Sequence, residues 1–258
     1  ERFTNEYLAG RTPNPCVLCN THIKWAALLR RADDLDCEYI ATGHYAQVEH
    51  DEDLDRYVLR RGLDRNKDQS YALWGLPQEH LARSIFPLGT YTKPEIRQMA
   101  SDFGLDRVAD KPDSYEICFI PDNDYGRFLR DRVDGLEEEV RGGDFVLKDG
   151  TVVGQHDGYP FYTIGQRHGF TISTHDAARR VHYVIAKDVA ANTLTVSITK
   201  PVRTTTDGVS LSQVVTRSAL TPGDVLEAQF RYRQTPVSVT VQSAKSESVR
   251  LVLNAATD

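Results

Sequence analysis

The 258-residue sequence contains no hydrophobic run that approaches the length of a membrane span. No signal peptide is recognisable at its start, so we expect a cytoplasmic protein without a membrane partner. Basic residues are in the minority, since 31 Lys and Arg stand against 37 Asp and Glu and the net charge is −6. A protein that coats nucleic acid is usually basic, so any contact with RNA must use local basic patches.

Cysteine is scarce, with four in the whole chain: Cys16, Cys19, Cys37 and Cys118. A chain of this length can bury a core without disulfide staples. The cysteines are therefore expected to be catalytic, metal-binding or buried. Because nothing near Cys37 activates its thiol, we interpret it as structural.

The first region, residues 1–121, shows an α/β pattern. Apolar residues at helical spacing predict an amphipathic helix over residues 17–35. A second helix is predicted over residues 93–103, capped by Thr92 and ended by Gly104. The remaining predicted elements are a short strand at residues 39–43 and a hairpin of residues 46–49 and 57–60.

The rest of the chain is predicted to be rich in strands. A short helix is expected at residues 125–133, and Asp149-Gly150 is typical of a hairpin turn. Strands are predicted at residues 145–147, 151–153, 181–186, 193–198, 228–233 and 237–241. The fold class is thus α/β plus β, with a small central mixed domain over residues 122–200 and a partial β-barrel over residues 201–258.

The Cys16-x-x-Cys19 spacing places both sulfurs on one face of the predicted helix. Asn14 and Pro15 mark the helix start, where the helix dipole favours a reactive thiolate. Two alternatives stay open: the pair could be small buried residues, or half of a zinc site. Cys118 lies among apolar neighbours, so core burial and a functional role are both compatible with its sequence.

Three further segments are candidate contacts for a phosphate or RNA. Gly43-His44 follows a strand, where a glycine lets backbone approach a ligand closely. Lys67-Asp68-Gln69-Ser70 is polar and compact, although a helix cap formed by Asp68 or Ser70 is the more usual explanation. Arg231 and Arg233 alternate around Tyr232 on a predicted strand, so both arginines share one face that can meet phosphates or solvent.

Taken together and in order, several motifs resemble the signature of the tRNA-specific 2-thiouridylase family. The matching motifs lie at residues 10–15, 19–20, 40–46, 67–71, 86–89, 117–120, 162–167 and 230–234. The resemblance covers nearly the whole chain. It implies a partial adenine-nucleotide α-hydrolase-like (PP-loop ATPase) domain over residues 1–121.

The resemblance also implies a reaction. Family members use ATP with Mg to adenylate the C2 oxygen of the wobble uridine, position 34, in tRNAs for Lys, Glu and Gln. A cysteine-bound sulfur then displaces AMP and leaves 2-thiouridine. A sulfur donor protein or sulfide is implied as a second partner. The chemistry is reasonable because thiolate-level sulfur is a strong, soft nucleophile.

Residue roles follow from the same resemblance. Cys118 matches the cysteine that carries a persulfide, and Cys19 matches the cysteine that attacks this persulfide. The target base matches residues 14–16, and Gly43 matches an ATP contact. The residues that match tRNA contacts are His44, Lys67, Asp68, Gln69, Arg231 and Tyr232.

The sequence departs from the family pattern in two respects. The glycine-rich ATP loop is absent, so the chain by itself is expected to be inactive. Many members carry an aspartate where this chain has Cys16. Cys16, Cys19 and Cys118 therefore resemble the three ligands of tRNA thiolases that hold a [4Fe–4S] cluster, in which one iron binds a sulfide.

Two other classes of protein are weighed against the thiolase. A non-catalytic RNA-binding module could hold structural zinc at its cysteines. A thiol-disulfide oxidoreductase could use Cys16 and Cys19, but the short redox-domain pattern expected around such a motif is absent.

Overall fold

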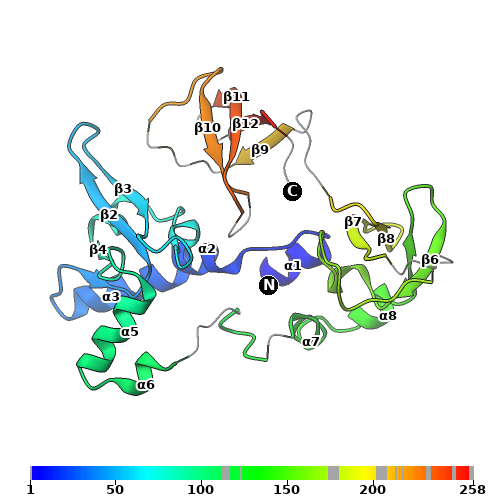
Figure 1. Cartoon of the computed structure of the whole chain (residues 1–258), viewed down its shortest axis with the longest axis horizontal. Helices are drawn as coiled ribbons and strands as arrows, with labels where there is room; N and C mark the ends of the chain where they lie inside the picture. The colour runs from blue at the N-terminus through cyan, green and yellow to red at the C-terminus, as the bar shows by residue number, and fades with distance from the viewer. Residues whose placement is uncertain are drawn as a thin grey trace. The chain divides into compact units, whose positions relative to one another are not determined.

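The computed structural model describes residues 2–111, 117–122, 124–173, 180–201, 208–212, 214, 216, 218–230, 234–245 and 248–255 (Figure 1). The chain divides into two compact units, each described here by itself. The first unit comprises residues 1–13, 115–204 and 256–258, and the second comprises residues 14–114 and 205–255. The predicted boundaries near residues 121 and 200 stay a prediction.

The second unit contains one long helix, three shorter ones, a 3-10 turn and eight short strands among the residues described. In chain order they are α2 (Pro15–Cys19), the π-helical η1 (Asn20–Lys24), α3 (Trp25–Asp34), β1 (Ile40–Ala41), β2 (Ala46–Asp51), β3 (Arg56–Arg61), the 3-10 turn η2 (Ser70–Ala72), α4 (Gln78–Ala82), β4 (Ser84–Ile85), α5 (Lys93–Asp102), α6 (Asp106–Ala109), β9 (Gly208–Ser212), β10 (Val225–Ala228), β11 (Val237–Lys245) and β12 (Ser248–Leu253).

Helices α2, η1 and α3 run on without a break (Figure 1), because the residues at both junctions keep right-handed helical dihedrals. The helix predicted over residues 17–35 is confirmed and starts slightly earlier. Asn14 is extended at the N-cap and Pro15 takes the first position, where its missing N–H costs nothing. Inside the helix, the N–H of Trp25 donates to the carbonyl of Asn20, five residues back. Such π-turns are frequent at functional sites.

A parallel strand pair anchors the long helix. Ile40 pairs with Ser84 and Ala41 with Ile85, a pairing that needs the long crossover typical of α/β folds. Trp25 is fully buried against these strands, and its Nε1 donates to Ser84 Oγ at 2.7 Å. The helix is thereby held in register with the sheet.

The other predicted elements of residues 1–121 are also confirmed. The hairpin forms between β2 and β3 as an antiparallel pair. Helix α5 carries a capping box of Thr92 and Glu95, and Gly104 follows it with a φ of 71°, which glycine adopts without strain.

The first unit packs helices against a mixed sheet. Its elements are α1 (Arg2–Leu8), α7 (Tyr125–Arg130), α8 (Leu136–Val140), β5 (Gly143–Val146), β6 (Val152–His156), η3 (Tyr159–Phe161), β7 (Tyr183–Asp188) and β8 (Thr193–Ser197). The strand order is β6-β5-β8-β7, with β5 and β8 parallel. The predicted turn is confirmed, because Gly150 N donates to Leu147 O at 3.0 Å. The core includes the fully buried Leu129, Phe145 and Leu194.

An antiparallel sheet of order β10-β11-β12-β9 forms the carboxyl-terminal part of the second unit. Its core is built from Val239, Val241 and Leu251, which alternate toward one face. The strand predicted over residues 228–233 is wrong at its start, since β10 ends at Ala228 and Gln229 and Phe230 lie outside any strand. Residues 231–233 lie outside the described residues. The α/β plus β class is nevertheless confirmed.

Among the residues described, no helix is both long and apolar enough to cross a membrane.

Gly143 packs closely against His156 and Asn192 in the mixed sheet. A Cβ at this position would lie 2.1 Å from His156 Cε1 and 2.4 Å from the carbonyl oxygen of Asn192. His156 is buried, and its Nδ1 accepts from Gly158 N at 3.0 Å. Asn192 in turn donates from Nδ2 to Val140 O at 2.6 Å. Only a residue without a side chain fits between these groups.

We expect Gly143→Ala to lower the free energy of unfolding by about 1–3 kcal/mol, the usual cost of forcing extra atoms into a packed interior. Gly154→Ala is the matched control in β6, because its nearest neighbours would lie at 3.4–3.6 Å. Urea denaturation of both variants checks the prediction. Equal midpoints for the two would contradict it.

Candidate functional site

The two cysteines of the Cys-x-x-Cys motif lie in the first turns of the long helix. Cys16 is exposed and Cys19 is half-buried, so the interpretation as two buried small residues is wrong for Cys16. Asn14 is exposed and Pro15 half-buried just ahead of them. The segment predicted to meet the target base is therefore open to solvent at the helix start.

The helix behind these cysteines is clamped by Asn20, of which 2% is exposed. Its Nδ2 donates to Ala72 O at 2.9 Å, and its backbone N–H donates to the carbonyls of Cys16 and Val17. Thr21 Oγ1 donates to Val17 O at 2.8 Å. Sequence reasoning gave Asn20 no role, although its place directly after Cys19 in a matching motif was a usable signal.

The turn that carries Gly43 and His44 is fixed by Gln69. Tyr45 N donates to Gln69 Oε1 at 3.0 Å, and Gln69 N donates to Tyr45 O at 2.9 Å. His44 is half-buried. Its Nδ1 lies 2.8 Å from Thr42 Oγ1, and its ring lies 5.6 Å from that of Trp25. Gly43 is exposed at the outside of the turn.

Burial lowers the pKa of His44 to about 4, with a smaller contribution from the positive charge of Lys24. The imidazole is therefore neutral at pH 7. A neutral ring has one nitrogen that donates and one that accepts, so His44 can hydrogen-bond a base or sugar and adds no charge toward phosphates.

The side-chain carboxylate of Asp68 accepts hydrogen bonds from residues of its own loop. Its Oδ1 accepts from Gly62 N at 3.0 Å and from Ser70 N at 3.2 Å. Its Oδ2 accepts from Ser70 Oγ at 3.0 Å. The N-cap position of η2 is Gln69, so Asp68 lies one residue ahead of it and binds Ser70, the first residue of the turn. Lys67, next to it, is half-buried.

Within the second unit, three side chains connect this α/β part to the segments that precede and follow strand β10 of the carboxyl-terminal sheet. Tyr71 Oη donates to Phe230 O at 3.2 Å, and Arg61 Nη2 donates to Gln229 Oε1 at 3.1 Å. Arg56 Nη1 donates to Thr216 O at 2.8 Å. The motif at residues 67–71 is thereby joined to the residue that precedes Arg231 and Tyr232. These last two candidates lie outside the described residues.

Cys118 lies in the first unit, at the tip of a turn. Ile120 N donates to Ile117 O at 2.9 Å, which leaves Cys118 and Phe119 at the two central positions of the turn. Cys118 is exposed, so the interpretation that places it in the core is wrong. Ile120, two residues on, is the buried one, with 1% exposed.

Aromatic rings and an ion pair hold this turn in place. Phe119 lies edge-on to Phe3 at 5.2 Å and near Phe128 at 5.5 Å. Arg127 pairs with Asp122 at 2.6 Å and also with Asp131. The hydrogen bond from Arg127 lowers the pKa of Asp122 below its usual range. The thiol is therefore presented to solvent on a supported loop.

The cysteines are also candidate metal ligands. Cys16 and Cys19 belong to the second unit and Cys118 to the first. Within the described part of each unit, no group of three or more His, Cys, Asp or Glu side chains lies close enough to hold a metal ion. Neither a zinc site nor a three-cysteine cluster finds its ligands gathered inside one unit.

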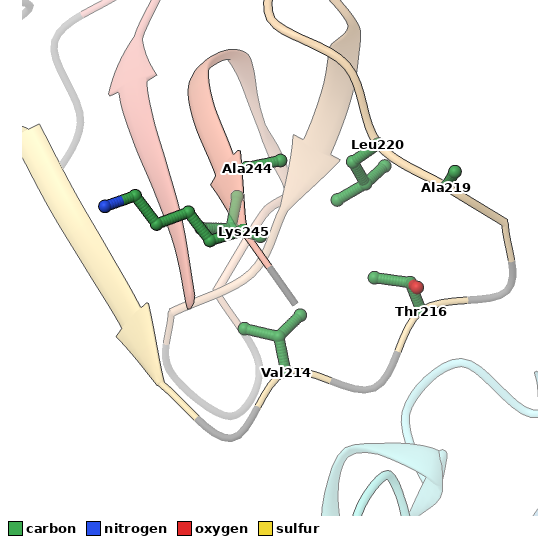
Figure 2. Close-up of a pocket in the computed structure, with 7 residues that line it drawn as sticks. Val214, Thr216, Ala219, Leu220, Ala244 and Lys245 are labelled. Carbon is green, nitrogen blue, oxygen red and sulfur yellow. The ribbon is translucent and has the colours of Figure 1, made fainter. Parts of the chain in front are cut away.

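A pocket of about 270 Å³ opens in the carboxyl-terminal sheet (Figure 2). Its lining residues are Val214, Thr216, Ala219, Leu220, Ala244, Lys245 and Val249. Figure 2 shows that the Lys245 amine points away from Leu220 and Ala219. The remaining lining is mostly apolar and includes none of the predicted site residues.

Comparison with protein families identifies the class of these domains. Residues 1–122 match the family model described as tRNA methyl transferase HUP domain. Residues 131–198 match the model described as tRNA methyl transferase PRC-barrel domain. The chain thus combines an α/β domain and a barrel-type domain of a tRNA-modifying class.

Curated relatives are more specific. The chain is 78% identical over 196 residues to the tRNA-specific 2-thiouridylase MnmA of Salinibacter ruber, covering 76% of this chain and 50% of that protein. It is 68% identical over 171 residues to the MnmA of Amoebophilus asiaticus, covering 66% of this chain and 45% of that protein. The chain is 43% identical over 254 residues to the MnmA of Carboxydothermus hydrogenoformans, covering 98% of this chain and 67% of that protein.

The chain belongs to the tRNA-specific 2-thiouridylase (MnmA) family. It spans about half the length of the Salinibacter and Amoebophilus relatives.

The depressed pKa of His44 makes the second unit sensitive to acid. Unfolding frees the imidazole to bind a proton at its ordinary pKa of 6.5, whereas the folded group binds one only near pH 4. The stability is therefore fully present above pH 6.5 and is lost as the pH falls toward 4. At about 1.4 kcal/mol for each tenfold change in proton affinity, the loss reaches roughly 3 kcal/mol.

We expect His44→Asn to flatten this part of the profile, because its side-chain amide does not titrate. Urea midpoints of wild type and variant, measured between pH 6.5 and pH 4, check the prediction. Parallel profiles for the two proteins would show that another group carries the acid sensitivity.

Proposed function

We propose that this chain is the part of a tRNA 2-thiouridylase that carries its sulfur-handling cysteines and part of its tRNA-binding surface. The observation that carries the proposal is the exposure of Cys118 on an anchored turn, because its apolar sequence neighbours left burial and exposure both open. A thiol that is exposed on a rigid loop suits a group that receives sulfur from a donor and passes it on. The similarity to MnmA relatives along the chain supports the substrate assignment.

The proposed reaction has two stages. ATP, with Mg, adenylates O2 of the wobble uridine in tRNAs of the Lys, Glu and Gln type. The terminal sulfur of a persulfide on Cys118, transferred as sulfane sulfur from a persulfide on a donor protein, then attacks C2, and AMP leaves with the former oxygen. Cys19 attacks Sγ of Cys118, which breaks the S–S bond of the persulfide and leaves a Cys19–Cys118 disulfide. The nucleotide-activating loop is expected to lie outside this chain, so the chain alone is expected to be inactive.

The tRNA surface is proposed to divide into contacting and supporting residues. His44 and Lys67 are half-buried at the surface of the second unit, where they can meet a base and a phosphate. Arg231 and Tyr232, which lie outside the described residues, stay proposed tRNA contacts. Asp68 and Gln69 use their side-chain oxygens for Gly62, Ser70 and Tyr45, so they support the surface more than they touch RNA.

A [4Fe–4S] cluster on Cys16, Cys19 and Cys118 would supply a sulfide bound to its open iron. The described residues of each unit hold at most two of these three ligands, so the steps above use the cysteine thiols alone. A zinc-containing RNA-binding module without catalysis is the other candidate, and it is decided by the experiment that follows.

We expect Cys118→Ala and Cys19→Ala each to abolish 2-thiouridine formation, because each removes a sulfur that the reaction needs. The complete reading frame that contains this chain is expressed in a bacterium without its own thiolase, and nucleosides of hydrolysed tRNA are measured by mass spectrometry. Cys37→Ser is the control, since Cys37 is exposed on the same protein and takes no part in the proposed steps.

If the folded wild-type protein restores no 2-thiouridine but binds tRNA and copurifies with zinc, the enzyme proposal is wrong and the binding module replaces it. If both cysteine variants retain full activity, the assignment of Cys19 and Cys118 fails while the thiolase assignment stands.

Gly43 allows a separate test of the proposed ATP contact. A Cβ there would meet only Leu88 Cδ1, at 3.7 Å, so the fold itself does not need a glycine. At Gly89, by contrast, a Cβ would lie 1.9 Å from Ala46 O. In the complete protein, we expect Gly43→Ala to keep the thermal midpoint and to raise the KM for ATP, because a methyl group blocks close approach of the nucleotide.

Gly89→Ala is the matched structural control and should lower the thermal midpoint. An unchanged KM for ATP in Gly43→Ala would remove Gly43 from the nucleotide site.

A further inference from the structure

Cys16 has no step in the proposed reaction, yet it is the more exposed member of the Cys16–Cys19 pair. Both lie in the right-handed helical turn that starts at Pro15. Ideal helix geometry separates Cα atoms three residues apart by about 5 Å and puts their side chains on one face. That separation lies within the roughly 4.4–6.8 Å that disulfides span.

We propose that Cys16 is a resolving cysteine, which takes over the bond to Cys19 and releases Cys118 after each sulfur transfer. This inference rests on the proposed function, because that reaction leaves a Cys19–Cys118 disulfide. The Cys16 thiolate attacks Sγ of Cys19, the Cys19–Cys118 bond breaks, and Cys118 leaves as a thiolate. The product is a Cys16–Cys19 disulfide within one helical turn.

The exchange itself needs no outside oxidant or reductant, because one disulfide replaces another. A low-molecular-weight thiol or a dithiol protein then reduces the Cys16–Cys19 bond and becomes a disulfide itself. Cys19 is half-buried, whereas Cys16 is exposed, so the Cys16–Cys19 disulfide keeps one sulfur open to a reductant. The thiolate of Cys118 is then free to accept the next sulfur atom and to form a persulfide again.

The local structure supports a defined pair. Asn20 and Thr21 hold the turn through bonds to Ala72 O and Val17 O, so Cys16 and Cys19 keep their relative placement. Cys37 cannot substitute for Cys16. It lies beyond the far end of the helix, which runs from Pro15 to Asp34, about five turns away.

Tryptic peptides separate the cysteines cleanly. Residues 12–24 contain both Cys16 and Cys19, residues 32–56 contain Cys37, and residues 108–127 contain Cys118, because the bond between Lys111 and Pro112 resists trypsin.

The chain is treated with the thiol oxidant diamide, remaining thiols are blocked with N-ethylmaleimide, and the digest is analysed without reduction. We expect residues 12–24 to appear unmodified and two hydrogen atoms lighter, equally in wild type and Cys37→Ser. Alkylation of both Cys16 and Cys19 under these conditions would overturn the proposal.

The second arm uses the complete protein with tRNA, ATP, a persulfide donor and limiting dithiothreitol. In Cys16→Ser, we expect residues 12–24 to accumulate cross-linked to residues 108–127 and the turnovers after the first to be lost. Excess dithiothreitol should restore turnover, which it would not do if Cys16 merely supported the fold. Continued turnover in Cys16→Ser without this cross-link overturns the resolving role and leaves the thiolase proposal intact. Absence of thiolation in wild type overturns the proposed function, and the resolving role with it.

Discussion

The paired hydrogen bonds between Gln69 and the backbone of Tyr45 hold the second unit's candidate site together. The same short segment accepts the side-chain amide of Asn20 at Ala72 O and reaches Phe230 O through Tyr71. Each bond satisfies a backbone group that is costly to leave unpaired away from water. The cysteine helix, the His44 turn and the segment that follows strand β10 are therefore positioned by one stretch of chain.

This arrangement is compatible with the proposal that an acidic protein carries an RNA-binding surface. Asp68, which places a negative charge inside a proposed tRNA-contact motif, has its oxygens occupied by Gly62 and Ser70. His44 is kept neutral by burial, so it suits base or sugar recognition more than attraction of phosphate. Under the proposed function, recognition of one folded tRNA would depend on a few lysines and arginines at defined places.

Much of the fold could be predicted from local pattern. The long helix, the β2–β3 hairpin and the Thr92-capped helix follow from spacing, capping and turn chemistry, which act between residues close in sequence. The prediction of a strand through Phe230 was wrong. The sequence alternates as a strand does, but Gln229 and Phe230 accept hydrogen bonds from Arg61 and Tyr71, which are far away in sequence. Local pattern carries no information on such partners.

The sequence by itself determined the class of fold, the family and the list of candidate residues, because ordered motifs and hydrophobic periodicity are properties of the chain. Only the tertiary structure decided whether each candidate side chain is exposed and which groups it hydrogen-bonds. Apolar neighbours left the burial of Cys118 open, and the turn anchored by Phe3 and Phe128 exposes it. Asn20 had no assigned role until its bond to Ala72 placed it behind the cysteine turn. Exposure and hydrogen bonding depend on which distant segments pack together, and that is fixed only when the chain folds.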